Sequence, residues 1–225
     1  MIELYGFQYS PAVREVRVAL EVKGLAYSYD PVDPYTERER LAQINPTGRV
    51  PVLRDGTATM TNAVDIFTHL ERTYPGVPLL PSVSPAREQA AQAHVFANNE
   101  LLMAMSGRLF FQRVIRQLHL GQPSDEGVVQ QALSVEVPGL LQRLEGALPE
   151  SGFLCGGLSI ADIAIGASMR AGLLAGVRVD RANYPRLANY LAAVFSIPAF
   201  VRVIAEEDTL APFQQAYQYY GWGLS

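Results

Sequence analysis

The sequence predicts a small α/β domain followed by an all-helical domain. Residues 1–76 alternate short strand-like and helical patterns bounded by Gly and Pro. The stretch PGVPLLPSVSP, residues 75–85, holds four prolines, which cannot continue a helix and stiffen an extended connector. Residues 86–225 carry apolar side chains at helical spacing. We therefore expect one domain at 1–76, a linker at 77–85 and a second domain at 86–225.

The order of elements in the first domain indicates a mixed sheet with flanking helices. An apolar opening MIELYGF is followed by a helical pattern, PAVREVRVALEVKG, and a second strand-like stretch, AYSYDPV. After the charged connection YTERERLAQI, the residues DGT separate two strand-like pieces in the manner of a hairpin. A helix, NAVDIFTHLERTYP, closes the domain. The arrangement β-α-β, then β-β-α, predicts a small sheet with helices packed against it.

Apolar residues recur every three or four positions through the second domain, as in a helical bundle. The residues with this helical spacing are Val95, Leu102, Met105 and Leu109, then Leu133, Val137, Leu140, Leu144 and Leu148, then Ile160, Ile163, Ala167, Ala171 and Leu174, and finally Leu187, Leu191 and Val194.

Composition and charge exclude several classes of partner. The 225 residues carry a net charge of −4 with no basic block, so we expect no nucleic acid and no anionic membrane surface as a partner. No apolar run approaches the ~18 residues that span a bilayer, and the opening residues lack the features of a signal peptide. A single cysteine, Cys155, fits a reducing compartment. We expect a cytoplasmic protein that acts on a small molecule.

Motifs for metal, nucleotide and hydrolase chemistry are missing. The three histidines, His69, His94 and His119, have no metal-ligand spacing, so we expect no metal. The sequence has no GxGxxG or Walker A loop, and the surroundings of Ser168 lack the second glycine of a nucleophile elbow. A thiol-disulfide enzyme would need a cysteine where Ser10 stands.

Two local patterns permit both a structural and a functional interpretation. Ser10 followed by Pro11 begins helices well, and a hydroxyl at a helix N-terminus can also face an anionic ligand. Val50–Pro51 at a strand entrance is a candidate cis bond, although roughly 5–6% of X-Pro bonds are cis, so the local pattern alone favours trans.

Of two later patterns, the first is interpreted as structural and the second permits both interpretations. Ser159 and Asp162 open an apolar run with the spacing of a capping box, whose role is folding. The aromatic tail, FQQAYQYYGWGLS, either lines a ligand mouth or pins the chain end to the core. Tyr9, Met103, Phe110 and Trp222 are equally acceptable as ligand-lining or core residues.

Taken together, four stretches resemble the cytosolic glutathione transferases in order and approximate spacing: SPAVREVRVAL, NPTGRVPVL, the proline linker and FLCGGLSIADIAI. The resemblance spans nearly the whole chain. It implies a thioredoxin-like first domain, an all-helical second domain, a homodimer, and glutathione as cosubstrate for attack on a small electrophile.

The resemblance also assigns site residues. It implies a cis Val50–Pro51 bond, with the backbone of Val50 pairing the cysteinyl part of glutathione. Ser10 stands where related proteins place the hydroxyl that hydrogen-bonds the thiolate, and Tyr5 and Tyr9 are its rivals. A helix-terminal hydroxyl suffices energetically, because lowering a thiol pKa by about 2 units requires ~2.7 kcal/mol and a charged hydrogen bond contributes roughly 1.5–3 kcal/mol.

The residues expected to bind the γ-glutamyl carboxylate of glutathione differ from the family pattern. The usual Glu-Ser pair corresponds here to Asn62 and Ala63, and Asp65 competes for the positive helix end. Loss of the serine hydroxyl weakens the binding of this carboxylate by roughly 1.5–3 kcal/mol. Thr61 and Arg49 are the nearest groups that could compensate. The alternative is therefore a noncatalytic protein of this fold, with weakened or lost glutathione binding, that acts as a binding or regulatory partner.

Overall fold

The computed structural model describes residues 1–224 and divides the chain into two compact units, Met1–Leu79 and a second unit that begins at Leu80. The first unit contains four strands and three helices in the order β1 (Ile2–Gly6), α1 (Pro11–Val22), β2 (Tyr27–Pro31), α2 (Arg38–Ile44), β3 (Val52–Asp55), β4 (Ala58–Met60) and α3 (Ala63–Thr73).

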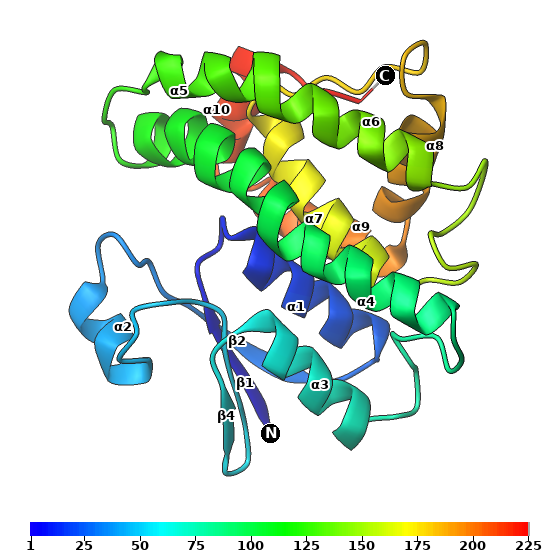
Figure 1. Cartoon of the computed structure of the whole chain (residues 1–225). Coiled ribbons are helices and arrows are strands. Elements are labelled where there is room, and N and C mark those ends of the chain that lie inside the picture. The colour runs from blue at the N-terminus through cyan, green and yellow to red at the C-terminus, as the bar shows by residue number, and fades with distance from the viewer. Residues whose placement is uncertain (225) are drawn as a thin grey trace. The chain divides into compact units, whose positions relative to one another are not determined.

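The strands form one mixed sheet in the order β2-β1-β3-β4. β1 pairs parallel with β2 and antiparallel with β3, and β3 pairs antiparallel with β4. Helices α1 and α3 lie side by side in Figure 1 and share one core with the sheet. The fully buried members of this core are Ile2, Leu4, Val13, Val16, Leu20, Leu53, Ile66 and Leu70. The β-α-β, β-β-α order predicted from the sequence is confirmed.

Helix α1 begins close above the sheet because Gly6 has no side chain. A Cβ atom at Gly6 would lie 2.6 Å from Cγ2 of Val13, closer than real Cβ contacts. The glycine therefore sets how near the start of α1 lies to the end of β1.

Helix α2 is the element that sequence patterning missed, since we treated YTERERLAQI as a connection. Leu41 is its only buried residue, and its N-cap, Glu37, makes no side-chain capping bond. A seven-residue helix with one buried position has no apolar stripe for periodicity to detect.

A carboxylate links β3 to α3 within the first unit. Asp55 Oδ2 lies 2.8 Å from His69 Nε2 and accepts a 2.7 Å hydrogen bond from the Tyr74 hydroxyl. The bond to His69, followed by that to Tyr74, lowers the pKa of Asp55.

We expect Asp55→Asn to destabilise the first unit at neutral pH by roughly 1.5–3 kcal/mol, the range for bonds to a charged acceptor. Because the folded-state pKa is lowered, the stabilisation is complete above the unfolded pKa near 3.8 and is lost as pH falls through the lower folded value. Urea denaturation at pH 7 and at stepwise lower pH checks this. A gap between variant and wild type that stays constant across that acid range would contradict it.

The second unit is helical. Its first helix, α4 (Ala86–Phe96), continues into the π-type segments η1 (Ala97–Leu101) and η2 (Met103–His119). Then follow α5 (Glu126–Gln131), η3 (Ala132–Glu136), α6 (Val137–Ala147), α7 (Ile160–Leu174), α8 (Pro185–Phe195), α9 (Pro198–Glu207) and α10 (Ala211–Tyr220). The all-helical second part predicted from the sequence is confirmed.

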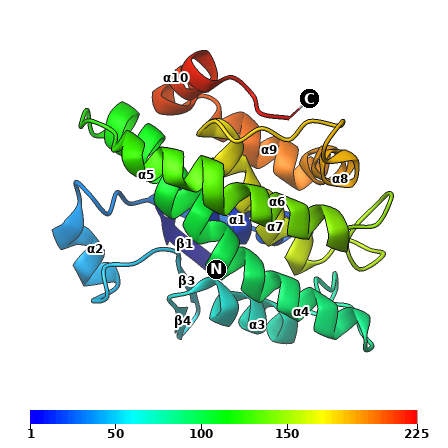
Figure 2. The same cartoon turned by 45° about the horizontal axis from the view of Figure 1, so that its top comes forward.

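Helix α7 is the centre of this unit. All fifteen of its residues are buried, and it contacts α4, η1, η2, α8 and α10. Figures 1 and 2 both show α7 inside the bundle. Most residues with the predicted helical spacing are buried, but Val95 is exposed, and Leu102, Leu133 and Leu140 are only partly buried.

No single helix among residues 1–224 is long and apolar enough to cross a membrane. Helices α8 and α9 pass that test only as a pair, by length and composition, and they are bent by 82° at the break between them.

Candidate functional site

The register of the sheet brings most of the predicted site residues to one edge. β3 runs antiparallel to β1 with Val52 opposite Tyr5, so the chain before β3 lies at the end where β1 finishes. β4 returns antiparallel to β3 with Met60 opposite Leu53, so it finishes at that same edge. In Figure 1 the turn between β3 and β4 lies at the opposite end of the sheet. The edge carries Ser10, Arg49, Val50, Pro51, Thr61, Asn62 and Ala63.

Ser10 caps helix α1 and keeps a proton to donate. Its backbone is extended, and its Oγ accepts a long, 3.4 Å hydrogen bond from the amide of Val13. The amide of Ser10 donates to the carbonyl of Phe7 at 2.9 Å, which fixes the loop between β1 and α1. The side chain is partly exposed, and no acceptor within residues 1–224 takes its hydroxyl proton. Capping therefore orients the oxygen and leaves a donor available to a ligand.

The two rival tyrosines are placed less favourably. Tyr5 alternates with the buried core residue Leu4, so its side chain is on the sheet face opposite α1. There its hydroxyl donates to Glu3 at 3.1 Å, and Arg54 lies over its ring at 4.9 Å. The structure does not bring Tyr5 to the side chain of Ser10.

Tyr9 is buried, with its ring 4.9 Å from that of Phe7 in an edge-on contact. Burial, and then the nearby Asp33 carboxylate, raises the pKa of the Tyr9 phenol. A phenol with a raised pKa is a weaker hydrogen-bond donor to a thiolate than an ordinary one. Among the three hydroxyls, Ser10 has the most suitable geometry.

The chain that enters β3 presents an unpaired backbone. The Val50–Pro51 bond is cis, as the family resemblance implies and against the local prior for trans. Within residues 1–224, neither the amide nor the carbonyl of Val50 has a hydrogen-bond partner. Unpaired groups at the end of a strand can pair with an extended peptide.

Asn45 holds the preceding loop in place, and sequence reasoning missed it as a site residue. Its side chain is buried, donates to the carbonyl of Arg49 at 2.9 Å and accepts from the amide of Thr47 at 3.2 Å. Asn45 thereby positions the residues that precede Val50. Arg49 itself is exposed. The signal was available in the NPTGRVPVL stretch, since asparagine side chains commonly bond their own backbone two residues on.

At the start of α3, the predicted competition from Asp65 takes a definite form. Asn62 is the N-cap: its Oδ1 accepts from the amide of Asp65 at 2.9 Å, and its Nδ2 donates to Asp65 Oδ2 at 2.6 Å. The next two amides, of Ala63 and Val64, have no acceptor in the part of the chain that the structure describes. Thr61 is partly exposed beside them.

Two helix N-termini therefore meet this edge, those of α1 and α3. Each presents backbone amides and a partial positive charge, which suits an anionic ligand. Asp65 offsets part of this at α3 without occupying the first two amides. Among residues 1–224, no three His, Cys, Asp or Glu side chains gather so as to hold a metal ion.

This arrangement can be compared with known proteins. Residues 4–78 match the family model described as "Glutathione S-transferase, N-terminal domain". The first unit thus matches the glutathione S-transferase N-terminal domain over nearly its whole length. Beyond that domain, a glutathione S-transferase of Triticum aestivum is 28% identical over 214 residues, which cover 93% of this chain and 95% of that protein.

A probable maleylacetoacetate isomerase of Caenorhabditis elegans is 27% identical over 206 residues, 88% of this chain and 90% of that protein. The crystal structure of a glutathione S-transferase from Rhodospirillum rubrum F11 superposes with a TM-score of 0.81 at 26% identity, covering 90% of this chain and 91% of that one. The glutathione S-transferase fold thus extends over both units, which confirms the predicted fold class.

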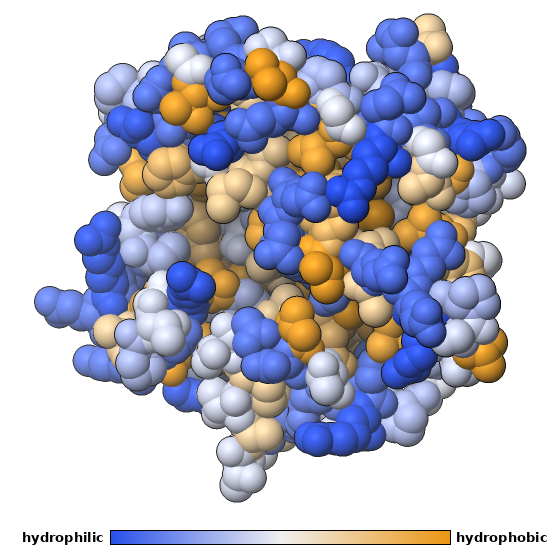
Figure 3. All heavy atoms as spheres, viewed as in Figure 1, coloured by the Kyte–Doolittle hydropathy of each residue, from blue (hydrophilic) through white to orange (hydrophobic). Residues whose placement is uncertain are grey.

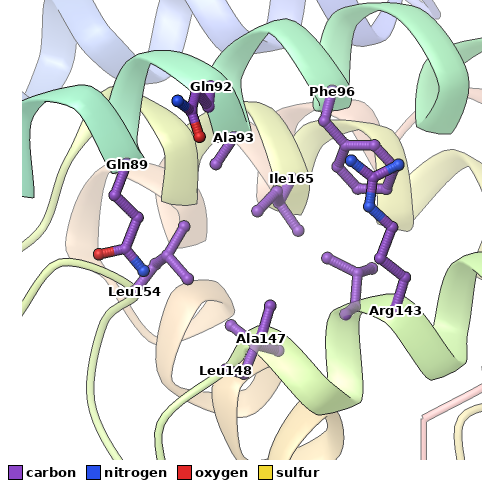
Figure 4. A pocket seen from close by; sticks show the side chains of 10 residues that line it. Gln89, Gln92, Ala93, Phe96, Arg143, Ala147, Leu148, Leu154 and Ile165 are labelled. Carbon is purple, nitrogen blue, oxygen red and sulfur yellow. The ribbon is translucent and has the colours of Figure 1, made fainter.

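The second unit of this transferase fold carries a small pocket between α4 and α6. In Figure 4, Arg143 lies over the ring of Phe96, at 4.2 Å, beside an apolar floor that includes Leu148 and Ile165. Apolar surface is visible between hydrophilic side chains over these helices in Figure 3. The volume of ≈ 190 Å³ lies below the roughly 300–1,000 Å³ of small-molecule sites. We assign it no ligand.

Proposed function

We propose that this protein is a glutathione S-transferase-like enzyme that binds glutathione on its first unit and transfers the thiolate to a small electrophile. One observation carries the proposal: hydrogen-bonding groups that have no partner among residues 1–224 gather at a single sheet edge. These are the Ser10 hydroxyl proton, the main chain of Val50 and the amides of Ala63 and Val64.

Each of these groups has a counterpart in glutathione. The extended cysteinyl residue pairs with the main chain of Val50 as a short added strand. The γ-glutamyl carboxylate accepts from the amides of Ala63 and Val64 at the positive end of α3. The cysteinyl sulfur then meets Ser10 at the start of α1.

The chemistry follows from stabilising the thiolate. A free thiol with a pKa near 8.5 is only ~3% ionised at pH 7. A hydrogen bond from Ser10 stabilises the anion by roughly 1.5–3 kcal/mol, with roughly 0.3–1 kcal/mol more from the helix end. The thiol proton passes to solvent, a sulfur lone pair forms the new C–S bond, and the leaving group departs with its bonding electrons. The nucleophile belongs to the cosubstrate, so no covalent enzyme intermediate forms.

Calorimetric titration with glutathione tests the proposal. We expect saturable binding, weakened for cysteinylglycine, because that dipeptide keeps the thiol and lacks the γ-glutamyl carboxylate. Absence of heat and of competition at millimolar glutathione would sink the proposal. The identity of the electrophile, the homodimer and the cytoplasmic location remain predictions.

The relative named a probable maleylacetoacetate isomerase supports a second reaction class at the same site. A thiolate can add to an activated carbon–carbon double bond, the resulting single bond rotates, and elimination returns both the thiolate and the isomerised alkene. With maleylacetoacetate as substrate, isomerisation by catalytic amounts of glutathione would support this class. Accumulation of a stable conjugate would support transfer instead.

The bond pair between Asn62 and Asp65 supports the noncatalytic alternative, because it places a carboxylate at the helix end that glutathione needs. We expect the double variant Asn62→Glu/Ala63→Ser to tighten glutathione binding by about ten- to a hundredfold, through the restored serine hydroxyl. The same calorimetric titration measures this.

The matched control for the double variant is Asp65→Asn, which removes the competing charge alone. It should tighten binding by only about two- to fivefold. If the natural protein already binds glutathione as tightly as the double variant does, the noncatalytic alternative loses its motive.

A further inference from the structure

The aromatic tail of the second unit is both pinned and part of a pocket, so the two interpretations of its sequence hold together. Val179 and Leu224 form an isolated parallel bridge, and the amide of Val179 donates to the carbonyl of Gly223 at 2.7 Å. A Cβ atom at Gly223 would lie 1.9 Å from the carbonyl oxygen of Val177. Only glycine allows this close approach, and the approach fixes the position of Trp222.

Trp222 forms one wall of an open pocket of ≈ 410 Å³ made by residues of α7, α8, α9, α10 and the tail. This volume falls within the roughly 300–1,000 Å³ of small-molecule sites. The ring of Trp222 lies 5.7 Å from that of Phe195 and 6.0 Å from that of Tyr217, and Trp222 is 37% exposed. Val201 and Ile204 complete the apolar side.

The polar end of this pocket holds a buried cation, and each of its nitrogens already has a partner. The side chain of Arg170 is 1% exposed. Its Nε donates to Glu207 at 2.9 Å, one terminal nitrogen donates to Tyr217 at 3.0 Å, and the other donates to Asp208 at 2.6 Å. Burial opposes the charge, but the neighbouring acidic groups outweigh it and raise the pKa of Arg170 above its usual value. Arg170 therefore stays charged, each of its three nitrogens already has a partner, and its burial keeps it from the open part of the pocket.

Asp208 has one carboxylate oxygen to spare. Its Oδ1 accepts from Arg170 at 2.6 Å and from the Tyr217 hydroxyl at 3.0 Å. Its Oδ2 has no donor among residues 1–224, and the side chain is 37% exposed on the pocket. The charged groups that this network contains are two carboxylates, those of Glu207 and Asp208, and one guanidinium, that of Arg170. The polar end thus carries a net negative charge beside aromatic rings.

This combination selects the charge and shape of a ligand. A cation is attracted both by a carboxylate and by the face of an indole ring. An apolar body gains by leaving water for the aromatic walls. The Asp208 carboxylate would repel an anion, and a neutral hydroxyl could donate to its free oxygen but would lack the attraction between opposite charges.

We propose that this pocket binds a small aromatic primary amine in its ammonium form. The ammonium donates to Asp208 Oδ2, and the aromatic ring packs on Trp222 and Phe195. The site consists only of residues from the second unit, and it does not depend on glutathione binding at the first.

The test uses the fact that Trp222 is the one tryptophan of the sequence. Its indole N–H gives a single NMR signal and its fluorescence reports on this site alone. The wild-type protein is titrated without glutathione, using 2-phenylethylammonium, then the neutral 2-phenylethanol and the anionic 3-phenylpropionate. We expect the amine to saturate the signal at concentrations at least about tenfold below those that the alcohol needs, and the anionic acid to give no saturable shift.

Asp208→Asn keeps an oxygen for Arg170 and Tyr217 while removing the charge. It should weaken amine binding by about ten- to a hundredfold. Equal responses to amine and alcohol, or unchanged affinity in Asp208→Asn, would overturn the proposal, as would no saturable response in the wild-type protein.

If Asp208→Asn does not fold, Trp222→Phe and Trp222→Leu decide the question by calorimetry. The phenylalanine variant keeps an aromatic face and should bind more tightly than the leucine variant by roughly two- to thirtyfold. Equal amine affinity in both variants would contradict the proposed packing on the ring.

Discussion

Asp162→Ala is expected to destabilise the second unit by roughly 3–5 kcal/mol, the range for removing one partner from a buried charged network. Asp162 is fully buried at the start of α7 and accepts four hydrogen bonds. Its Oδ2 takes the amide and the hydroxyl of Ser159 at 2.8 and 2.7 Å. Its Oδ1 takes the amide of Leu154 and the hydroxyl of Tyr190, both at 2.9 Å.

Alanine would leave these donors buried without an acceptor. Burial, followed by the Asp162 carboxylate, raises the pKa of Tyr190 well above its usual value, so that hydroxyl stays a donor. The capping role predicted from the sequence is thus one part of a larger network, which also ties α7 to the preceding loop and to α8.

Thermal denaturation measures the effect, with an expected fall in Tm of about 10 °C for Asp162→Ala. Ser159→Ala is the matched control, because it removes one hydroxyl and leaves the carboxylate with its other partners. Its cost should be about 1 kcal/mol. Similar losses in the two variants would show that the carboxylate does not organise the network.

Ser10→Ala is expected to lower kcat/KM for glutathione conjugation by about ten- to a hundredfold at neutral pH, because one hydrogen bond to the thiolate is lost. Without this donor the pKa of bound glutathione rises, so the activity should recover as pH increases. The acid limb of the pH–rate profile should shift upward by about 1–2 units.

The profile is measured with a reactive aryl halide and compared with Ser10→Thr, which keeps both the hydroxyl and the cap. The cap contributes about 1 kcal/mol to stability, so denaturation of each variant separates a folding effect from a catalytic one. Retained glutathione binding with an unchanged profile in Ser10→Ala would remove Ser10 as the thiolate partner. It would leave the proposed binding site intact.

The long elements could be predicted because their residues obey local rules. α1 begins at Pro11 with Ser10 as its N-cap, and α7 begins at its capping box, as the sequence indicates. The exceptions fail for physical reasons. α2 buries a single leucine, and Val95 has helical spacing but lies on an exposed face of α4. The spacing of apolar residues identifies the apolar face of a helix, but it does not show whether another element packs on that face.

The candidate site was predictable as a set of residues and not as an arrangement. The Val50–Pro51 bond is cis, which the local prior opposed and the family resemblance supported. Asn45, which holds the loop before Val50, was not predicted as a site residue, because its partners are backbone groups that no side-chain motif indicates. Tyr5 and Tyr9 could not be told apart from Ser10 until the structure placed Tyr5 on the sheet face opposite α1 and showed that Tyr9 is buried.

By itself, the sequence determined the two-part organisation, the order of strands and helices in the first unit apart from α2, and which residues begin the main helices, because capping, turns and apolar spacing act over a few neighbouring positions. Only the tertiary structure decided which strand ends share an edge, which donors stay unpaired, and that Asp208 keeps a free oxygen beside Trp222. These properties depend on pairing register and packing between residues far apart in the chain, where no local pattern records the outcome.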